Sequence, residues 1–122
     1  LHTTAIGKVL LAEHESSYIQ KQLKGTKFIK STPNTIENIE QLLKELAIVK
    51  QQKFGEDNEE QEPGLRCIAA PIYDRFGNVI AGVSISFPTI RFNEQMKKRY
   101  VELLHNAGRA ISEQLGFKKY PA

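Results

Sequence analysis

Hydrophobic residues recur every three or four positions in four stretches of the chain. This spacing places them on one face of a helix, and it predicts helices over about residues 4–13, 18–23, 35–53 and 94–115. Short polar residues stand at the expected helix starts, where their side chains can accept hydrogen bonds from free backbone amides. These candidate N-caps are Thr3 or Thr4, Ser16 or Ser17, Asn34 and Asn93.

The last of these helices has the longest apolar stripe, which we expect to be its buried face. Its members are Tyr100, Leu103, Leu104, Ala107, Ile111 and Leu115. Gly116 follows the stripe and is typical of a helix C-terminus.

Two β-rich segments, Leu65–Tyr73 and Val79–Phe87, are predicted to be strands. The residues between them, Asp74-Arg75-Phe76-Gly77-Asn78, have the composition of a hairpin turn. Residues 56–62 hold five of the fourteen acidic residues and are expected to form a solvated loop. Helices around an antiparallel hairpin indicate an α+β fold. Because two strands alone are marginally stable, we expect further strands from upstream sequence or from a partner.

The second predicted strand has two different faces, since successive side chains point to opposite sides. Val79, Ala81, Val83, Ile85 and Phe87 form an apolar face, whereas Ile80, Gly82, Ser84 and Ser86 form the other. If the hairpin loop has four residues, Asp74 pairs with Val79, which places Cys67 opposite Ser86 and Ala69 opposite Ser84. Cys67, Ser84 and Ser86 then share a surface that suits a small polar ligand. An ordinary sheet face, with a buried cysteine and solvated serines, is the alternative.

The composition indicates a single globular domain. The chain has 122 residues, of which 40% are hydrophobic and 25% charged. Its one cysteine, Cys67, cannot form an internal disulfide, and this usage is consistent with a reducing cytoplasm. The apolar runs are far shorter than the roughly 20 residues that span a bilayer, so we expect no membrane partner and a cytoplasmic location.

Charge and histidine spacing argue against several function classes. The net charge is +3, and Lys97-Lys98-Arg99 is the only basic triplet, so nucleic-acid binding by these residues is not expected. The histidines at positions 2, 14 and 105 show no metal-ligand spacing and no family-like spacing to Cys67. We therefore expect no metal, no cofactor and no catalytic residue, because a cysteine nucleophile needs a positioned base.

Three segments resemble, in the same order, the signature motifs of the effector-binding domain of IclR-type transcriptional regulators. They are His2–Ala12, Gly64–Ile72 and Ala81–Ser86. The stretch 54–92 is most similar to the members that repress pectin and 2-keto-3-deoxygluconate catabolism. The resemblance implies a GAF-like domain, with a central antiparallel sheet flanked by helices and a pocket for a small keto acid or carboxylate.

The resemblance also implies which residues contact the ligand. Carried over position by position, these would be Asp57, Cys67, Ser84 and Ser86, with the backbone amides of Ala5 and Ile6 as an anion site. A helix N-terminus suits that role because its amides lack partners within the helix. Some relatives have Gly-Ala where this chain has Ala5-Ile6, so the bulkier Ile6 is expected to narrow the pocket.

Family members carry an N-terminal winged helix-turn-helix domain and assemble as homodimers or dimers of dimers. The chain does not begin with methionine, and we expect residues 1–122 to be part of an effector domain that lacks its first strands and the DNA-binding domain. The resemblance thus implies a non-enzymatic sensing domain of a repressor of sugar-acid catabolism, which contacts DNA only through the absent domain. The alternatives are a GAF-like domain that serves only oligomerisation and a small-molecule enzyme that uses Cys67.

The dispersed charge leads to a prediction about DNA. These 122 residues should bind an operator no more tightly than any weakly basic protein, because no helix-turn-helix is predicted in them. Titration of labelled operator and scrambled duplexes at several salt concentrations measures this. Operator-specific binding with a steep salt dependence would contradict the prediction.

Overall fold

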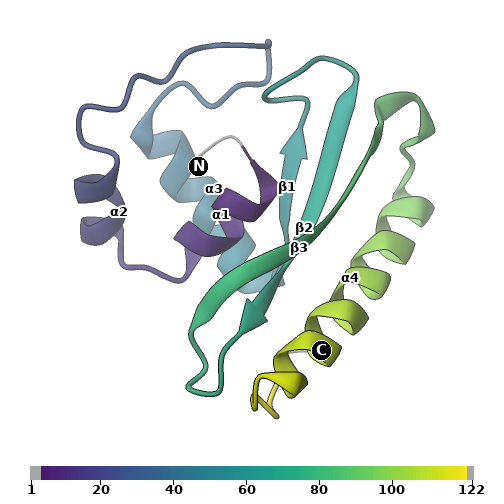
Figure 1. Cartoon of the computed structure of the whole chain (residues 1–122). Coiled ribbons are helices and arrows are strands. Elements are labelled where there is room, and N and C mark those ends of the chain that lie inside the picture. Colours follow the sequence, from purple (N-terminus) through teal and green to yellow (C-terminus); the bar gives the residue numbers. More distant parts are fainter. Residues whose placement is uncertain (1–3, 121–122) are drawn as a thin grey trace.

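The computed structural model describes residues 4–120 and consists of a sheet between two helical layers (Figure 1). The helices α1 (Ala5–Ala12), α2 (Ser16–Gln22) and α3 (Ile39–Gln52) lie on one side of the sheet, and α4 (Glu94–Gln114) lies on the other. The strands are β1 (Gly55–Asn58), β2 (Leu65–Tyr73) and β3 (Val79–Pro88), and a short 3-10 helix, η1 (Thr89–Arg91), follows β3. Among the helices of the described residues, none has the length and apolar character that crossing a bilayer requires.

The strands form an antiparallel sheet in the order β1-β2-β3, which confirms the predicted α+β class with its central antiparallel sheet. The solvated loop predicted for residues 56–62 is wrong in its first half, because residues 55–58 form β1. This strand pairs Gly55 with Ala69 and Asp57 with Cys67. Its Glu, Asp and Asn side chains have low strand propensity, so only the pairing with β2 reveals it. The additional strand is therefore supplied by the chain itself.

Two of the predicted N-caps are confirmed. The Thr4 side chain accepts a hydrogen bond from the Gly7 amide, and Asn93 accepts one from Met96. Thr3, the alternative cap for the first helix, lies outside the described residues.

The other two predicted N-caps are wrong. Ser16 is the first residue of α2, and the N-cap position is held by Glu15 without a side-chain bond. The third helix begins at Ile39 because Asn38 caps it by accepting from the Gln41 amide. Asn34 instead donates its side-chain N–H to the Asn58 carbonyl, 3.0 Å away, within the loop that precedes α3.

The register of the hairpin agrees with the prediction over most of its length. Cys67 pairs with Ser86, and Ala69 pairs with Ser84. At the turn end the expected pairing of Asp74 with Val79 is wrong, because Tyr73 takes that place and a bulge shifts the register. The Asp74 carboxylate accepts hydrogen bonds from the amides of Phe76 and Asn78, which draws Asp74 into the turn.

The sheet separates two apolar cores. One core packs α1 and α3 against the sheet, and its buried members include Val9, Leu42, Leu46 and Ala69. The other packs α4 against the opposite face, around Ile68, Ala70, Phe87 and Leu104. Val83 and Ile85 contact this second core as predicted, whereas the bulge places Val79 against the first.

The helix α4 is oriented differently from the prediction. Its buried residues are Leu104, Gly108 and Ser112, whereas Leu103, Ile111 and Leu115 are 40–43% exposed. The small residues let the helix approach β2 closely: the Ser112 hydroxyl accepts from the Tyr73 amide at 3.0 Å, and a Cβ on Gly108 would lie 2.9 Å from the Pro71 carbonyl oxygen. Close backbone contact therefore outweighs the apolar stripe in setting this face.

The helix α1 also lies close to the sheet, and glycines make this possible. A Cβ added at Gly55 in β1 would lie 2.9 Å from the Ala5 carbonyl oxygen. A Cβ added at Gly82 in β3 would lie 3.2 Å from the Ile6 side chain. The first contact is with backbone and the second with a side chain that can move.

This difference gives a matched pair of variants. Gly55→Ala should lower the free energy of unfolding by about 1–3 kcal/mol, because its methyl group forces α1 away from the sheet. Gly82→Ala should lower the free energy of unfolding by less, since the Ile6 side chain can change its conformation. Urea unfolding of both variants measures the difference. A Gly55→Ala protein as stable as the parent would show that α1 is not held tightly against β1.

Candidate functional site

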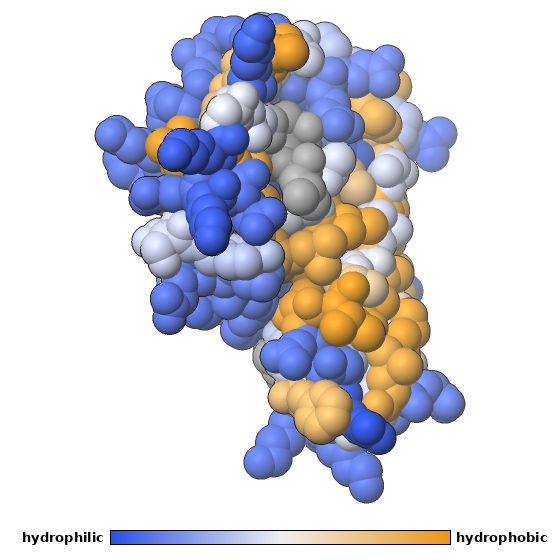
Figure 2. Space-filling model, turned by 60° about the vertical axis from the view of Figure 1, so that its left-hand side comes forward, coloured by the Kyte–Doolittle hydropathy of each residue, from blue (hydrophilic) through white to orange (hydrophobic). Residues whose placement is uncertain are grey.

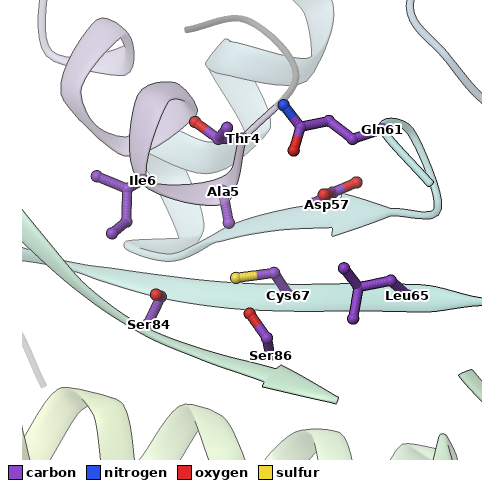
Figure 3. A pocket seen from close by; sticks show the side chains of 9 residues that line it. All are labelled: Thr4, Ala5, Ile6, Asp57, Gln61, Leu65, Cys67, Ser84 and Ser86. Carbon is purple, nitrogen blue, oxygen red and sulfur yellow. The ribbon is translucent and has the colours of Figure 1, made fainter. Parts of the chain in front are cut away.

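A cavity of about 290 Å³ lies where the N-terminus of α1 meets the sheet (Figure 3). Its lining residues are Thr4, Ala5, Ile6, Asp57, Gln61, Leu65, Cys67, Ser84 and Ser86. All six site residues expected from the sequence therefore line one pocket. Its volume is near the lower end of the range for small-molecule sites, roughly 300–1,000 Å³.

Strand pairing brings the polar residues of the pocket together. Asp57 pairs with Cys67, and Cys67 pairs with Ser86, so these three residues form one row across the sheet. Ser84 lies two residues from Ser86 and so shares its face. The serines are exposed, Cys67 is half-buried and Asp57 is buried, so the pocket closes toward β1 and opens toward β3.

The N-terminus of α1 forms the opposite wall (Figure 3). The Thr4 hydroxyl accepts from the Gly7 amide at 2.9 Å. The amides of Ala5 and Ile6 come earlier in the helix, where helix geometry provides no acceptor. Together with the helix dipole they favour an anion. Ile6 lines this wall, and its side chain lies close to Gly82.

Asp57 is the acidic group of the pocket and is 5% exposed. Its Oδ1 atom accepts a hydrogen bond from the Glu60 amide at 2.8 Å. Burial raises the pKa of Asp57, while the Glu60 amide and the nearby charge of Lys8 act in the opposite direction. The pocket thus has a carboxyl group that can accept hydrogen bonds at its β1 wall and backbone donors at its α1 wall.

A buried ion pair behind Asp57 was not foreseen from the sequence. Lys8 is 0% exposed, and its Nζ atom donates to Glu60 Oε2 at 2.6 Å and to the Glu56 carbonyl at 2.7 Å. It also approaches Glu45 Oε1 at 3.4 Å. Burial raises the pKa of Glu60, whose other oxygen has no hydrogen-bond partner among residues 4–120. The sequence carries no local signal for this pair, because its members are 52 residues apart.

Three lining residues were also missed. Leu65 shares its strand face with Cys67, so the alternation of β2 contained a signal for it. The sequence pattern indicates only an N-cap role for Thr4, and Gln61 comes from the turn after β1, whose path the pattern does not indicate.

The pocket is equipped for binding. Within residues 4–120 no group of His, Cys, Asp and Glu could hold a metal ion. The lining residues from this part of the chain include no histidine or lysine that could take the proton of Cys67. Hydroxyls, a thiol, a carboxylate and helix amides are groups that orient a small polar molecule.

Comparisons with known proteins agree with this geometry. Residues 1–113 match the family model described as "Bacterial transcriptional regulator IclR C-terminal". The chain is 57% identical over 121 residues to the HTH-type transcriptional regulator KdgR of Dickeya chrysanthemi. The alignment covers 99% of this chain and 40% of that protein. It spans less than half the length of the curated relatives it matches.

Solved structures share the fold. The C-terminal domain of E. coli transcriptional regulator KdgR aligns with a TM-score of 0.91 at 54% identity, covering 95% of this chain and 71% of that one. The inducer-binding domain of the PobR transcription factor from Acinetobacter, a double mutant in complex with 3-hydroxybenzoic acid, aligns with a TM-score of 0.85 at 28% identity, covering 91% and 64%. The chain therefore belongs to the IclR family of bacterial transcriptional regulators and corresponds to part of their C-terminal domain.

Proposed function

We propose that this chain is the effector-sensing domain of a transcriptional repressor of sugar-acid catabolism and that it binds 2-keto-3-deoxygluconate. The observation that carries the proposal is a pocket that the N-terminus of α1 lines together with Asp57, Cys67, Ser84 and Ser86. The identity to KdgR regulators and the resemblance to that branch of the family support this ligand. The 3-hydroxybenzoic acid complex of PobR supports a carboxylate as the ligand class.

The ligand has groups that match each wall of the pocket. Its carboxylate would accept hydrogen bonds from the amides of Ala5 and Ile6 and from the serine hydroxyls. Asp57 would repel that carboxylate, so it accepts hydrogen bonds from the ligand hydroxyls instead. Cys67 would pack against the ligand as a small, weak donor and would not react.

The effector would act by biasing an assembly of subunits. A homodimer or dimer of dimers would set the spacing of winged helix-turn-helix domains, and DNA binding would belong to those domains. A purely oligomeric role is the second candidate, and one observation favours it: the exposed apolar face of α4. Figure 2 shows a further continuous apolar area beside a mostly hydrophilic one, on a side of the molecule from which α4 is turned away.

Replacement of Ser84 and Ser86 tests the ligand proposal. The variant Ser84→Ala/Ser86→Ala should bind 2-keto-3-deoxygluconate about tenfold or more weakly, since each lost bond to a charged group is worth about 1.5–3 kcal/mol. Its stability should match that of the parent, because both side chains are exposed. Calorimetry measures the affinity, with Ser17→Ala on α2 as the control. Undiminished binding by the double variant would show that the site is assigned wrongly.

Sedimentation of the protein and of an α4 variant tests the proposed assembly of subunits. The parent should sediment as a dimer or larger species at high micromolar concentration, because α4 leaves Leu103, Ile111 and Leu115 uncovered. Ile111→Glu should lower the sedimentation coefficient toward that of a monomer. The control is Ile48→Glu, which changes an exposed isoleucine on α3. A monomeric parent would exclude assembly through these residues.

A further inference from the structure

The buried ammonium of Lys8 joins three parts of the fold that meet behind the pocket. Lys8 belongs to α1, the helix whose first two residues line the pocket. Its Nζ atom contacts the backbone of β1 at the Glu56 carbonyl and the turn after β1 at Glu60. Lys8 itself does not line the pocket. It therefore ties the α1 wall to the segment that carries the acidic wall.

Glu60 connects Lys8 to the end of β1 through two hydrogen bonds, one with Asn58 and one with Asp57. Its carboxylate, which holds Lys8, also accepts from the Asn58 amide at 3.0 Å. Its own amide donates to Asp57 Oδ1. The side chains of Asp57 and Glu60 thus close the same turn from both ends, and Glu59 within it adopts a left-handed φ of 54°. Such a turn keeps its shape only while its contacts persist.

The turn is anchored from outside as well. The hydroxyls of Thr32 and Thr35 donate to the carbonyls of Glu59 and Glu60, respectively. Both threonines are buried. The carbonyl side of the turn is therefore held by the loop before α3, and its carboxylate side is held by Lys8.

We propose that Lys8 is a positioning residue of the effector pocket, which acts through Glu60 to fix Asp57 at the distance from the α1 amides that a hydroxylated keto acid requires. The inference rests on the proposed function, because it assigns the ligand hydroxyls to Asp57. A buried ion pair contributes little net stability compared with apolar residues of similar size, so its value here lies in geometry. The carboxylate site at the α1 amides does not depend on the turn.

This division of the pocket predicts a change in selectivity. A ligand that has hydroxyls uses both walls, whereas pyruvate has only a carboxylate and a keto group and uses the α1 wall. Loosening the turn should lower the affinity for the hydroxylated ligand and leave the affinity for pyruvate unchanged. A general loss of structure would lower the affinity for both ligands by the same factor.

The test variant is Lys8→Met/Glu60→Gln, which removes both charges and leaves no unpaired ion in the core. We expect its affinity for 2-keto-3-deoxygluconate to fall about tenfold while its affinity for pyruvate changes less than twofold, as measured by calorimetry. The matched control is Lys30→Met/Glu37→Gln, which makes the same substitutions in an exposed ion pair at 2.7 Å. The control should bind both ligands as the parent does.

Hydrogen exchange of the unmodified protein tests the same coupling without any substitution. Saturating 2-keto-3-deoxygluconate should slow exchange of the Asn58 and Glu60 amides at least fivefold, and saturating pyruvate should leave them unchanged.

Three results would each overturn the positioning role. In the double variant these are an equal loss of affinity for both ligands, or an unchanged affinity for 2-keto-3-deoxygluconate. In hydrogen exchange it is equal protection of the two amides by both ligands. A parent protein that binds neither ligand would instead contradict the proposed function.

Discussion

One buried charge on α1, that of Lys8, ties this helix to the turn after β1. Lys8 lies on the face of α1 that packs toward β1, where an unpaired ammonium would be very costly. Glu60 and the Glu56 carbonyl compensate this charge, and they can do so only when the turn after β1 folds back over the helix. Removing one partner of such a pair typically costs about 3–5 kcal/mol, a large part of the 5–15 kcal/mol that stabilises a domain.

The polarity of the pocket follows from the positions of α1 and β1 on the sheet. The N-terminus of α1 lies over β2 and β3, so donors face the serine side of the sheet. Asp57 comes from β1 at the other side, where burial raises its pKa and the Glu60 amide orients it. Opposite walls of one small cavity thus prefer opposite ends of an asymmetric ligand. Glycines at positions 55 and 82 allow the helix to come close enough to form both walls.

The two faces of the sheet serve different purposes. The face toward α1 carries the pocket row of Asp57, Cys67 and Ser86, whereas the face toward α4 is an apolar core around Phe87 and Leu104. The alternation of β2 and β3 separates them, so a pocket can exist beside a closed core. Close packing of Gly108 and Ser112 then turns larger apolar residues of α4 outward, which leaves them exposed.

Local patterns determined much of this protein. The two-residue period of β3 separated Ser84 and Ser86 from the apolar side chains. The predicted register correctly placed Cys67 opposite Ser86, although a bulge changes the pairing at the turn. Ala5, Ile6 and Asp57 came from the family resemblance, because no local pattern connects a helix start with an acidic segment. Tertiary structure decided the rest: β1 forms because β2 offers it a pairing edge, and the packed face of α4 follows from backbone contact at Gly108. The Lys8–Glu60 pair depends on contacts 52 residues apart, which neither periodicity nor propensity encodes.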